Sequence, residues 1–317
     1  MFQIPFFEEL KRAKKVLIAG AGGGYDIYGG VPFYLALKAK GKQPFLASFS
    51  FTDVKKVNAL EIGKYCSMIT HSTKPPNPNF YFPEKYLASW FYEKKNLDVP
   101  IYLLHRVGPK LLRDSYKLLL EALDFDTIVL VDGGTDALMK GNESGLGTPV
   151  EDSTSIVALN SLGIARSYLL FIGFGVDDFH GVSHYDVLEN LADFIKIGAF
   201  KGCFSLMKEM PEVRDYMAAL SYANKCLKYQ KSIVQNSIVS ALHGDFGNIH
   251  VIEKTKASEL FISPLMSQVW CLDLAQVCRR LMYASEISEE TRLIRVSRII
   301  DEFRDGIKLK KRHRIPL

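Results

Sequence analysis

The sequence lacks the long apolar stretches that would place it across a membrane. None of its apolar runs approaches the roughly 18 residues that a membrane-spanning helix needs. The opening segment, MFQIPFFEELKRAKK, carries Glu8, Glu9 and Lys11 where a signal peptide would be apolar. We therefore expect a cytoplasmic protein with no membrane partner.

Cysteine is sparse, and its spacing excludes two common structural uses of thiols. The five cysteines are scattered and form no C-x-x-C pair, so the sequence predicts neither a disulfide framework nor a zinc knuckle. We expect small core residues at these positions: Cys66, Cys203, Cys226, Cys271 and Cys278.

The folded body also lacks an excess of positive charge. The formal net charge is +5, but five basic residues fall within the last ten positions: Lys308, Lys310, Lys311, Arg312 and Arg314. A nonspecific nucleic-acid binder would carry a basic face through its folded body. The charge distribution therefore predicts no nucleic-acid partner.

Three catalytic signatures are missing. No serine occupies a G-x-S-x-G elbow, no cysteine has a histidine in a nucleophile signature, and no G-x-x-x-x-G-K-[ST] motif occurs. These absences argue against an α/β-hydrolase and a P-loop kinase. Carboxylate-centred or metal-assisted chemistry is then the better expectation for an enzyme.

Short apolar runs alternate with amphipathic stretches through the first half of the sequence. This pattern is typical of a parallel sheet with helices on both faces. Helices are expected over Pro109–Ala122 and over Asp152–Ser161, with Asp152 or Ser153 as the N-cap. We predict an α/β fold, a Rossmann-like doubly wound and mostly parallel sheet over residues 1–184. Its expected strands are Val16–Ala19, Pro44–Phe51, Ile101–His105, Thr127–Val131 and Tyr168–Phe174.

The later part of the chain has mostly helical patterns. We expect residues 185–317 to form a helical extension packed on the core, although no linker separates the parts and one continuous domain is equally compatible. Residues 248–254 and 258–263 are expected to form a strand pair. The expected helices are Asp186–Ile197, Glu212–Tyr229, Ser232–Leu242, Pro264–Ala284 and Glu289–Phe303.

One proline-rich segment interrupts the first half. Residues 70–86, THSTKPPNPNFYFPEKY, contain four prolines and several aromatic residues. Prolines at this density prevent a regular helix or strand. We expect an ordered surface loop or a lid.

A first glycine loop, residues 20–25 (GAGGGY), joins an expected strand to a helix. Such a loop lets backbone N–H groups approach an anion, so Gly22, Gly23 and Gly24 are predicted to bind a phosphate or carboxylate. Asp26 stands where the dinucleotide fingerprint takes a small residue. It would bind a metal, a ribose hydroxyl or a cationic group; the alternative is a tight turn with Asp26 capping the helix.

A second glycine loop, residues 132–148 (DGGTDALMKGNESGLGT), follows the strand Thr127–Val131. Carboxylates at strand ends are where open α/β sheets place ligand groups. We predict Asp132 and Asp136 as base or metal ligands. Ligand-binding roles are predicted for further residues in and after this loop: Gly133, Gly134, Thr135, Glu143 and Asp152. The alternative is that these acids only stabilise turns.

Strand order links the two loops. If Thr127–Val131 lies beside Val16–Ala19, as in the common doubly wound order, both loops face the crevice at the point where the order reverses. The segment after the next strand adds Asp177 and His180 as catalytic candidates, with Asp178 and His184 nearby. A secondary group lies much later in the sequence: His243, Asp245 and His250.

Several motifs, in this order, resemble one protein family. They are GAGGGYD, VDGGTD followed by GLGTPVED, GFGVDD, SPLM and RHRIP. Together they resemble the microbial family called domain of unknown function 1152, over essentially the whole chain. The resemblance implies a Rossmann-like α/β protein and carries no catalytic assignment. Ser263 stands where the family has an asparagine, so no role is transferred there.

Three functions remain open. The first is a hydrolase, lyase or transferase that acts on a nucleotide-like, sugar-phosphate or similar anionic small molecule, with a divalent metal or a nucleotide as cofactor. The second is a noncatalytic ligand-binding or sensing protein that uses the same crevice. The third is an NAD(P)-dependent oxidoreductase with Asp53 as the ribose-binding acid. All three predict a small-molecule partner and are compatible with a homo-oligomer.

The C-terminal segment, residues 308–317 (KLKKRHRIPL), ends in the apolar residues Ile315, Pro316 and Leu317. An apolar tip after a charged stretch predicts that the segment docks onto the body or a neighbouring subunit. Arg312 and Arg314 would then lie near acidic surface. The alternative is a solvated end that frays.

Overall fold

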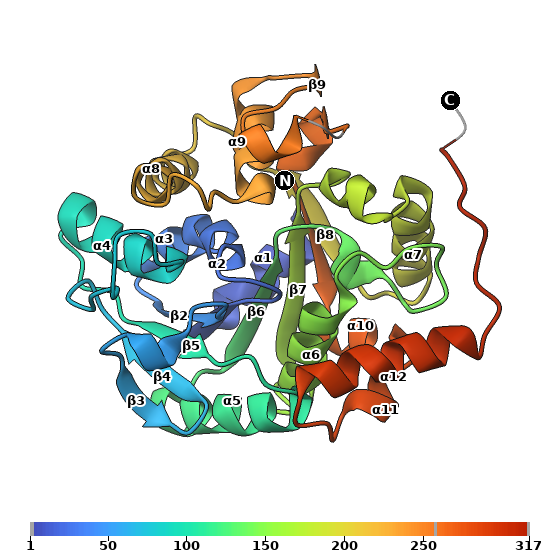
Figure 1. Cartoon of the computed structure of the whole chain (residues 1–317), viewed down its shortest axis with the longest axis horizontal. Helices are drawn as coiled ribbons and strands as arrows, with labels where there is room; N and C mark the ends of the chain where they lie inside the picture. Colours follow the sequence, from blue (N-terminus) through green and yellow to red (C-terminus); the bar gives the residue numbers. More distant parts are fainter. Residues whose placement is uncertain (1–2, 257–258, 316–317) are drawn as a thin grey trace.

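A central sheet organises the computed structural model, which describes residues 3–256 and 259–315. Within these residues the sheet has nine strands in the order β3-β4-β5-β2-β1-β6-β7-β11-β8 (Figure 1). The strands are β1 Lys15–Gly20, β2 Gln43–Phe49, β3 Leu60–Gly63, β4 Cys66–Ile69, β5 Ile101–Leu104, β6 Thr127–Asp132, β7 Arg166–Ile172, β8 Phe200–Ser205 and β11 Gln268–Asp273.

The five middle strands are parallel and follow the predicted doubly wound order. Strand β1 pairs with β2 on one side and with β6 on the other, so Leu17 lies opposite both Phe45 and Ile128. Buried parallel strands need apolar residues on both faces. Val16 and Ile18 pack into one core, and Leu17 and Ala19 pack into the other.

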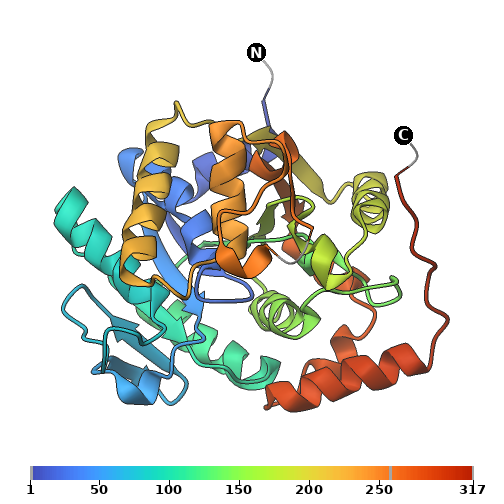
Figure 2. The ribbon, with the colours of Figure 1, turned by 45° about the horizontal axis from the view of Figure 1, so that its top comes forward.

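Helices cover both faces of the sheet. One layer contains α1 Pro5–Arg12, α2 Asp26–Gly29, α3 Val31–Ala39, α4 Pro83–Lys95, α8 Pro211–Cys226 and α9 Ile233–His243. The other contains α5 Pro109–Leu123, α6 Pro149–Asn160, α7 His184–Lys196, α10 Leu274–Arg280, α11 Ala284–Ile287 and α12 Leu293–Asp305. Helices α8 and α9 lie beside α2 at the carboxyl edge of the sheet (Figures 1 and 2). Among the described residues, no helix has the length and apolar character needed to cross a bilayer.

The structure confirms the α/β fold and most of the predicted helices. It also shows that the predicted helix Pro264–Ala284 is wrong, because Gln268–Asp273 forms strand β11 between β7 and β8. This stretch buries Val269, Cys271 and Leu272 in the sheet, and tertiary pairing decides its conformation. Strands β3, β4 and β8 were also not predicted. The later part of the chain therefore contributes two strands to the central sheet, β8 and β11, as well as helices.

Two further expectations need correction. The predicted strand pair is limited to two residues on each side, β9 Gly247–Asn248 and β10 Phe261–Ile262. Helix α6 begins at Pro149 with Thr148 as its N-cap, so Asp152 and Ser153 are not caps. Asp152 instead lies in the first turn of α6, and its carboxylate is buried.

The C-terminal segment docks onto the body as predicted (Figure 1). The Lys310 N–H donates to the Asn142 carbonyl at 2.8 Å, and Lys310 Nζ pairs with Glu189. Arg312 donates to the Gly181 carbonyl at 2.9 Å and pairs with Asp178. Residues 308–315 thus contact the second glycine loop, helix α7 and the turn after β7. Pro316 and Leu317, which belong to the predicted apolar tip, lie outside the described residues.

We predict that deleting residues 308–317 lowers the melting temperature, because both turns lose hydrogen bonds to the segment. Differential scanning calorimetry measures the change. The matched point variants are Arg312→Ala, which should lower the melting temperature, and Arg314→Ala, which should not, because only Arg312 has a hydrogen-bonded partner in the described structure. Equal melting temperatures for the deletion and the full chain would show that the contacts do not stabilise the fold.

Candidate functional site

Five aspartates converge at the carboxyl edge of the parallel strands. Asp26 begins α2 after β1, Asp132 ends β6, and Asp152 lies in the first turn of α6. Asp136 and Asp177 lie in short 3-10 turns, Asp136–Leu138 and Val176–His180, after β6 and β7. Asp26 keeps part of its surface open, whereas the other four are buried. The predicted strand order therefore brings both glycine loops and their carboxylates to one place.

Three of these residues form a compact group that we call the acid trio: Asp26, Asp132 and Asp152. Each offers a carboxylate oxygen, and the three oxygens lie within 4.8 Å of one another. Asp132 Oδ2 and Asp152 Oδ1 are buried without a hydrogen-bond partner in the described structure. Buried polar atoms are nearly always paired, so two unpaired carboxylate oxygens within this group of residues indicate a missing ligand.

The first glycine loop binds one of the protein's own carboxylates. The Gly22 N–H donates to Asp26 Oδ2 at 2.7 Å, and the N–H groups of Gly23 and Gly133 also hydrogen-bond to Asp26. Sequence reasoning assigned these backbone donors to an external anion. In this structure they orient Asp26 toward the other two carboxylates of the trio.

Asp136 and Asp177 each hold the second glycine loop through hydrogen bonds to one carboxylate oxygen. Asp136 Oδ2 accepts from the Thr148 N–H at 2.8 Å and from its hydroxyl at 2.7 Å. Asp177 Oδ2 accepts from the Thr135 N–H at 2.6 Å and from its hydroxyl at 3.2 Å. Both residues lie among the predicted site residues, but their hydrogen bonds indicate a positioning role.

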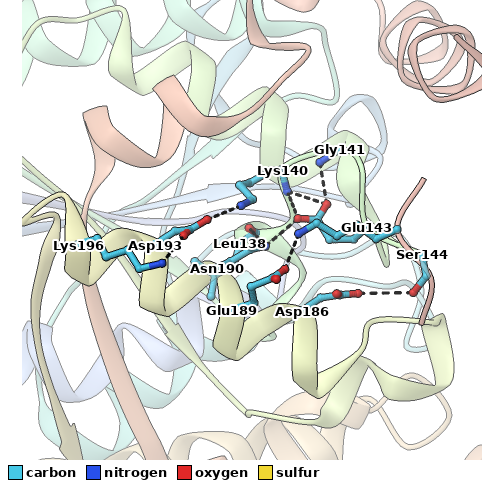
Figure 3. A network of polar contacts seen from close by, with 11 residues as sticks. Leu138, Lys140, Gly141, Glu143, Ser144, Asp186, Glu189, Asn190, Asp193 and Lys196 are labelled. Atoms are coloured by element: carbon cyan, nitrogen blue, oxygen red, sulfur yellow. Dashed lines mark hydrogen bonds and ion pairs between the residues drawn. The ribbon is translucent and has the colours of Figure 1, made fainter. Parts of the chain in front are cut away.

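Glu143 also binds the backbone of the second glycine loop, on the side that faces α7 (Figure 3). It is fully buried and accepts from the N–H groups of Lys140 and Gly141 and from Asn190 Nδ2 at 2.8 Å. Lys140 Nζ pairs with Asp193 on the same helix at 2.9 Å. This network fixes the loop to α7, and Glu143 is not part of the acid trio.

The histidine candidates are not in the trio. His180 is exposed, and its ring packs on Phe179. Burial lowers the pKa of His184, whose Nδ1 lies 3.7 Å from Asp178. His243 ends α9 and is exposed, before Gly244 with a φ of +91° closes the helix.

Sequence reasoning missed Gln235, which reaches the site from α9. Its Oε1 accepts from the Tyr216 hydroxyl at 2.7 Å, whereas its Nε2 is buried without a partner in the described structure. A Cβ placed on Gly133 would lie 2.9 Å from this Nε2 and 2.8 Å from Asp26 Oδ1. The segment S-x-x-Q, Ser232 to Gln235, resembles a capping box and signals a helix start, but nothing in it points to a site.

A pocket opens directly beside the trio. It has a volume of about 310 Å³ and is lined by Gly23, Gly24, Tyr25, Asp26, Tyr81, Gln230, Lys231 and Ser232. Tyr81 comes from the predicted proline-rich loop, which is irregular up to the start of α4 at Pro83. Asp26 belongs to both the pocket and the trio, so a ligand in the pocket would have access to the carboxylates.

The carboxylates of the site have unusual electrostatics. Burial raises the pKa of Asp26 to about 7, and the neighbouring charge of Asp136 adds to the effect. Burial and then neighbouring acids likewise raise the pKa values of Asp132, Asp152 and Asp177 well above the usual value. No ion pair among residues 3–256 and 259–315 involves any of the five aspartates. The site can therefore compensate its charge by binding protons or a cation.

Comparison with known proteins gives one match. A family model described as Protein of unknown function (DUF1152) matches residues 17–304. No curated protein and no solved structure matches the chain.

We predict that the metal-free protein loses stability as the pH rises from about 4 to 8. The pKa values of the trio are higher in the folded state than in the unfolded state, so the unfolded state releases its protons first and is favoured as the pH rises. Asp152→Asn removes one buried charge and should raise the melting temperature by a few degrees at pH 8 in EDTA, but not at pH 4. Thermal melts at both pH values check this. If Asp152→Asn instead lowers the melting temperature equally at pH 4 and at pH 8, the carboxylate is required for the structure.

Two glycines of the first loop should respond differently to alanine. A Cβ on Gly22 would lie 2.2 Å from Asp152 Oδ1, whereas a Cβ on Gly23 would meet only the Phe51 ring at 3.8 Å. We expect Gly22→Ala to destabilise the fold by about 1–3 kcal/mol through overpacking. Gly23→Ala should change the free energy of unfolding by less than about 0.5 kcal/mol. Urea denaturation measures both, and equal effects would contradict the tight packing of Gly22 on Asp152.

Proposed function

The chain belongs to the DUF1152 family, whose description assigns no reaction, and we propose that it is a cytoplasmic enzyme that binds a divalent cation on the acid trio. The bound cation would carry out metal-assisted chemistry on a small anionic molecule. Such a molecule would enter through the pocket beside Asp26. The free state of all five cysteines agrees with a reducing compartment.

The observation that carries this proposal is the pair of unpartnered oxygens, Asp132 Oδ2 and Asp152 Oδ1. Together with Asp26 they offer three carboxylate ligands within 4.8 Å, a donor set that suits hard cations such as Mg²⁺, Mn²⁺ or Ca²⁺. A cation held by the three carboxylates would give these residues a positive partner, and it would offset the burial and the mutual repulsion that raise their pKa values. Thiol and imidazole ligands are absent from the trio, which argues against a structural zinc site.

The residues around the trio would then have separate tasks. Asp26, Asp132 and Asp152 would hold the cation, and Asp26 would be kept in place by the amides of Gly22 and Gly133. Asp136 and Asp177 would fix the second glycine loop. The cation would polarise a substrate oxygen or activate a water molecule. The Nε2 of Gln235 would donate to a bound oxygen near Asp26.

The structure gives less support to the other two hypotheses. A noncatalytic binding protein needs no carboxylates at close range, whereas enzymes that use paired carboxylates place them about 5 Å apart or with a metal between them. The trio has this spacing. For a dinucleotide enzyme, the Gly22 N–H would have to face the ligand, but it binds Asp26. Asp53, the expected ribose-binding acid, is half exposed and pairs with Lys56 at 3.0 Å.

We predict that Mn²⁺ binds one site per chain and that the melting temperature rises with the logarithm of the free Mn²⁺ concentration once this exceeds the dissociation constant. Changing a residue outside the ligand shell of a metal typically weakens metal binding by roughly 10–100-fold. Asp132→Asn removes a ligand itself and should weaken the binding of Mn²⁺ by more than this. Isothermal titration calorimetry with Mn²⁺, Mg²⁺ and Ca²⁺ measures the affinity. Asp245→Asn, an acid on the loop after α9, is the matched control and should bind as the unmodified chain does.

Two results would contradict the proposed metal site. If the unmodified chain binds no divalent cation at millimolar concentration, or if Asp132→Asn and Asp245→Asn bind equally well, the trio is not a metal site. The carboxylates would then be held protonated as a structural feature of the fold.

A further inference from the structure

We propose that the pocket beside Asp26 binds the phosphate group of a small phosphomonoester, with Lys231 and the first turn of α9 as its ligands. This inference rests on the proposed function, because one phosphate oxygen would also contact the cation on the acid trio. It adds the substrate class and assigns a role to the segment Gln230–Ser232, which precedes α9.

Lys231 is the single basic residue among those that line the pocket. Its side chain is half buried and makes no hydrogen bond or ion pair within residues 3–256 and 259–315. A lysine ammonium group without a partner is available to an anion. Asp26 also lines the pocket and belongs to the trio. The pocket thus combines a free cationic side chain with a site for a metal cation.

The N-terminus of α9 adds neutral donors on the same side. Ser232 is the N-cap, and its hydroxyl accepts from the Gln235 N–H at 3.1 Å. The backbone N–H groups of Ile233 and Val234, the first two residues of the helix, have no acceptor inside the helix. The helix has eleven residues, so its dipole also favours an anion at this end. The unpartnered Nε2 of fully buried Gln235 lies near Asp26, a residue that lines the pocket, and is an independent sign that a ligand acceptor belongs beside Asp26.

The shape and chemistry of the pocket favour a phosphate over a carboxylate. A phosphate has three terminal oxygens, so one can bind the cation while the others accept from Lys231 and from the amides of α9. A carboxylate has only two. Gly23 and Gly24 line the pocket without side chains, and Tyr25 and Tyr81 also line it. A volume of about 310 Å³ is at the lower end of the usual range for ligand pockets, roughly 300–1,000 Å³, which suits a sugar phosphate or a nucleoside monophosphate.

The test measures phosphate binding and metal binding separately on the full chain. Isothermal titration calorimetry in Mn²⁺ uses ribose 5-phosphate and adenosine 5′-monophosphate, with ribose, adenosine and citrate as the phosphate-free comparisons. Lys231→Gln should weaken binding of the phosphate compounds at least about tenfold and leave Mn²⁺ affinity unchanged. Lys228→Gln is the matched control, because Lys228 is an exposed lysine in the same loop that does not line this pocket.

Each other outcome overturns a specific claim. Equal phosphate affinity in Lys231→Gln and Lys228→Gln, or binding of citrate in place of the phosphate compounds, contradicts the phosphate site while the metal site stands. Failure of the unmodified chain to bind either phosphate compound in Mn²⁺ contradicts it as well. If Mn²⁺ itself does not bind, the proposed function fails and the phosphate site fails with it.

Discussion

The burial of several carboxyl groups without a cationic partner is the constraint on which the rest of this structure depends. Removing a carboxylate from water costs several kcal/mol unless it is protonated, paired or bound to a metal. The fold meets part of this cost with backbone amides, because Gly22 and Gly133 donate to Asp26, and Thr135 and Thr148 donate to Asp177 and Asp136. Asp132 Oδ2 and Asp152 Oδ1 remain uncompensated. Protons or a bound cation would offset the remaining cost, and the proposed function rests on the cation.

The glycine loops are best understood as supports for these carboxylates. A side chain on Gly22 would collide with Asp152, and one on Gly134 would lie 2.7 Å from Asp177 Oδ2. Glycine therefore allows the backbone to approach the acids closely enough to hydrogen-bond to them. The same loops leave Gly23 open toward the pocket, with only the Phe51 ring near its Cβ position. One short segment thus both fixes Asp26 and leaves room for a ligand.

Much of this arrangement could be predicted from the sequence, because it follows from strand order. Strong apolar runs identified β1 and β6, and their adjacency brought Asp26 and Asp132 together. Asp152 was among the predicted ligand-binding residues, but its place in the first turn of α6 could not be predicted, since a helix-start pattern does not show which residue is the cap. Strand β11 was mistaken for a helix because a short apolar run has no clear period. Gln235 and Lys231 are far from the glycine loops in sequence, and only tertiary packing brings α9 beside α2.

The central claim is that the acid trio is a cation site, and an anomalous diffraction experiment tests it most directly. Crystals grown with Mn²⁺ and measured near the manganese absorption edge would reveal the ion independently of any assay. The account predicts one strong anomalous peak within bonding distance of Asp26, Asp132 and Asp152. A fully ordered trio with no peak, or with Mn²⁺ bound only elsewhere on the chain, would contradict it.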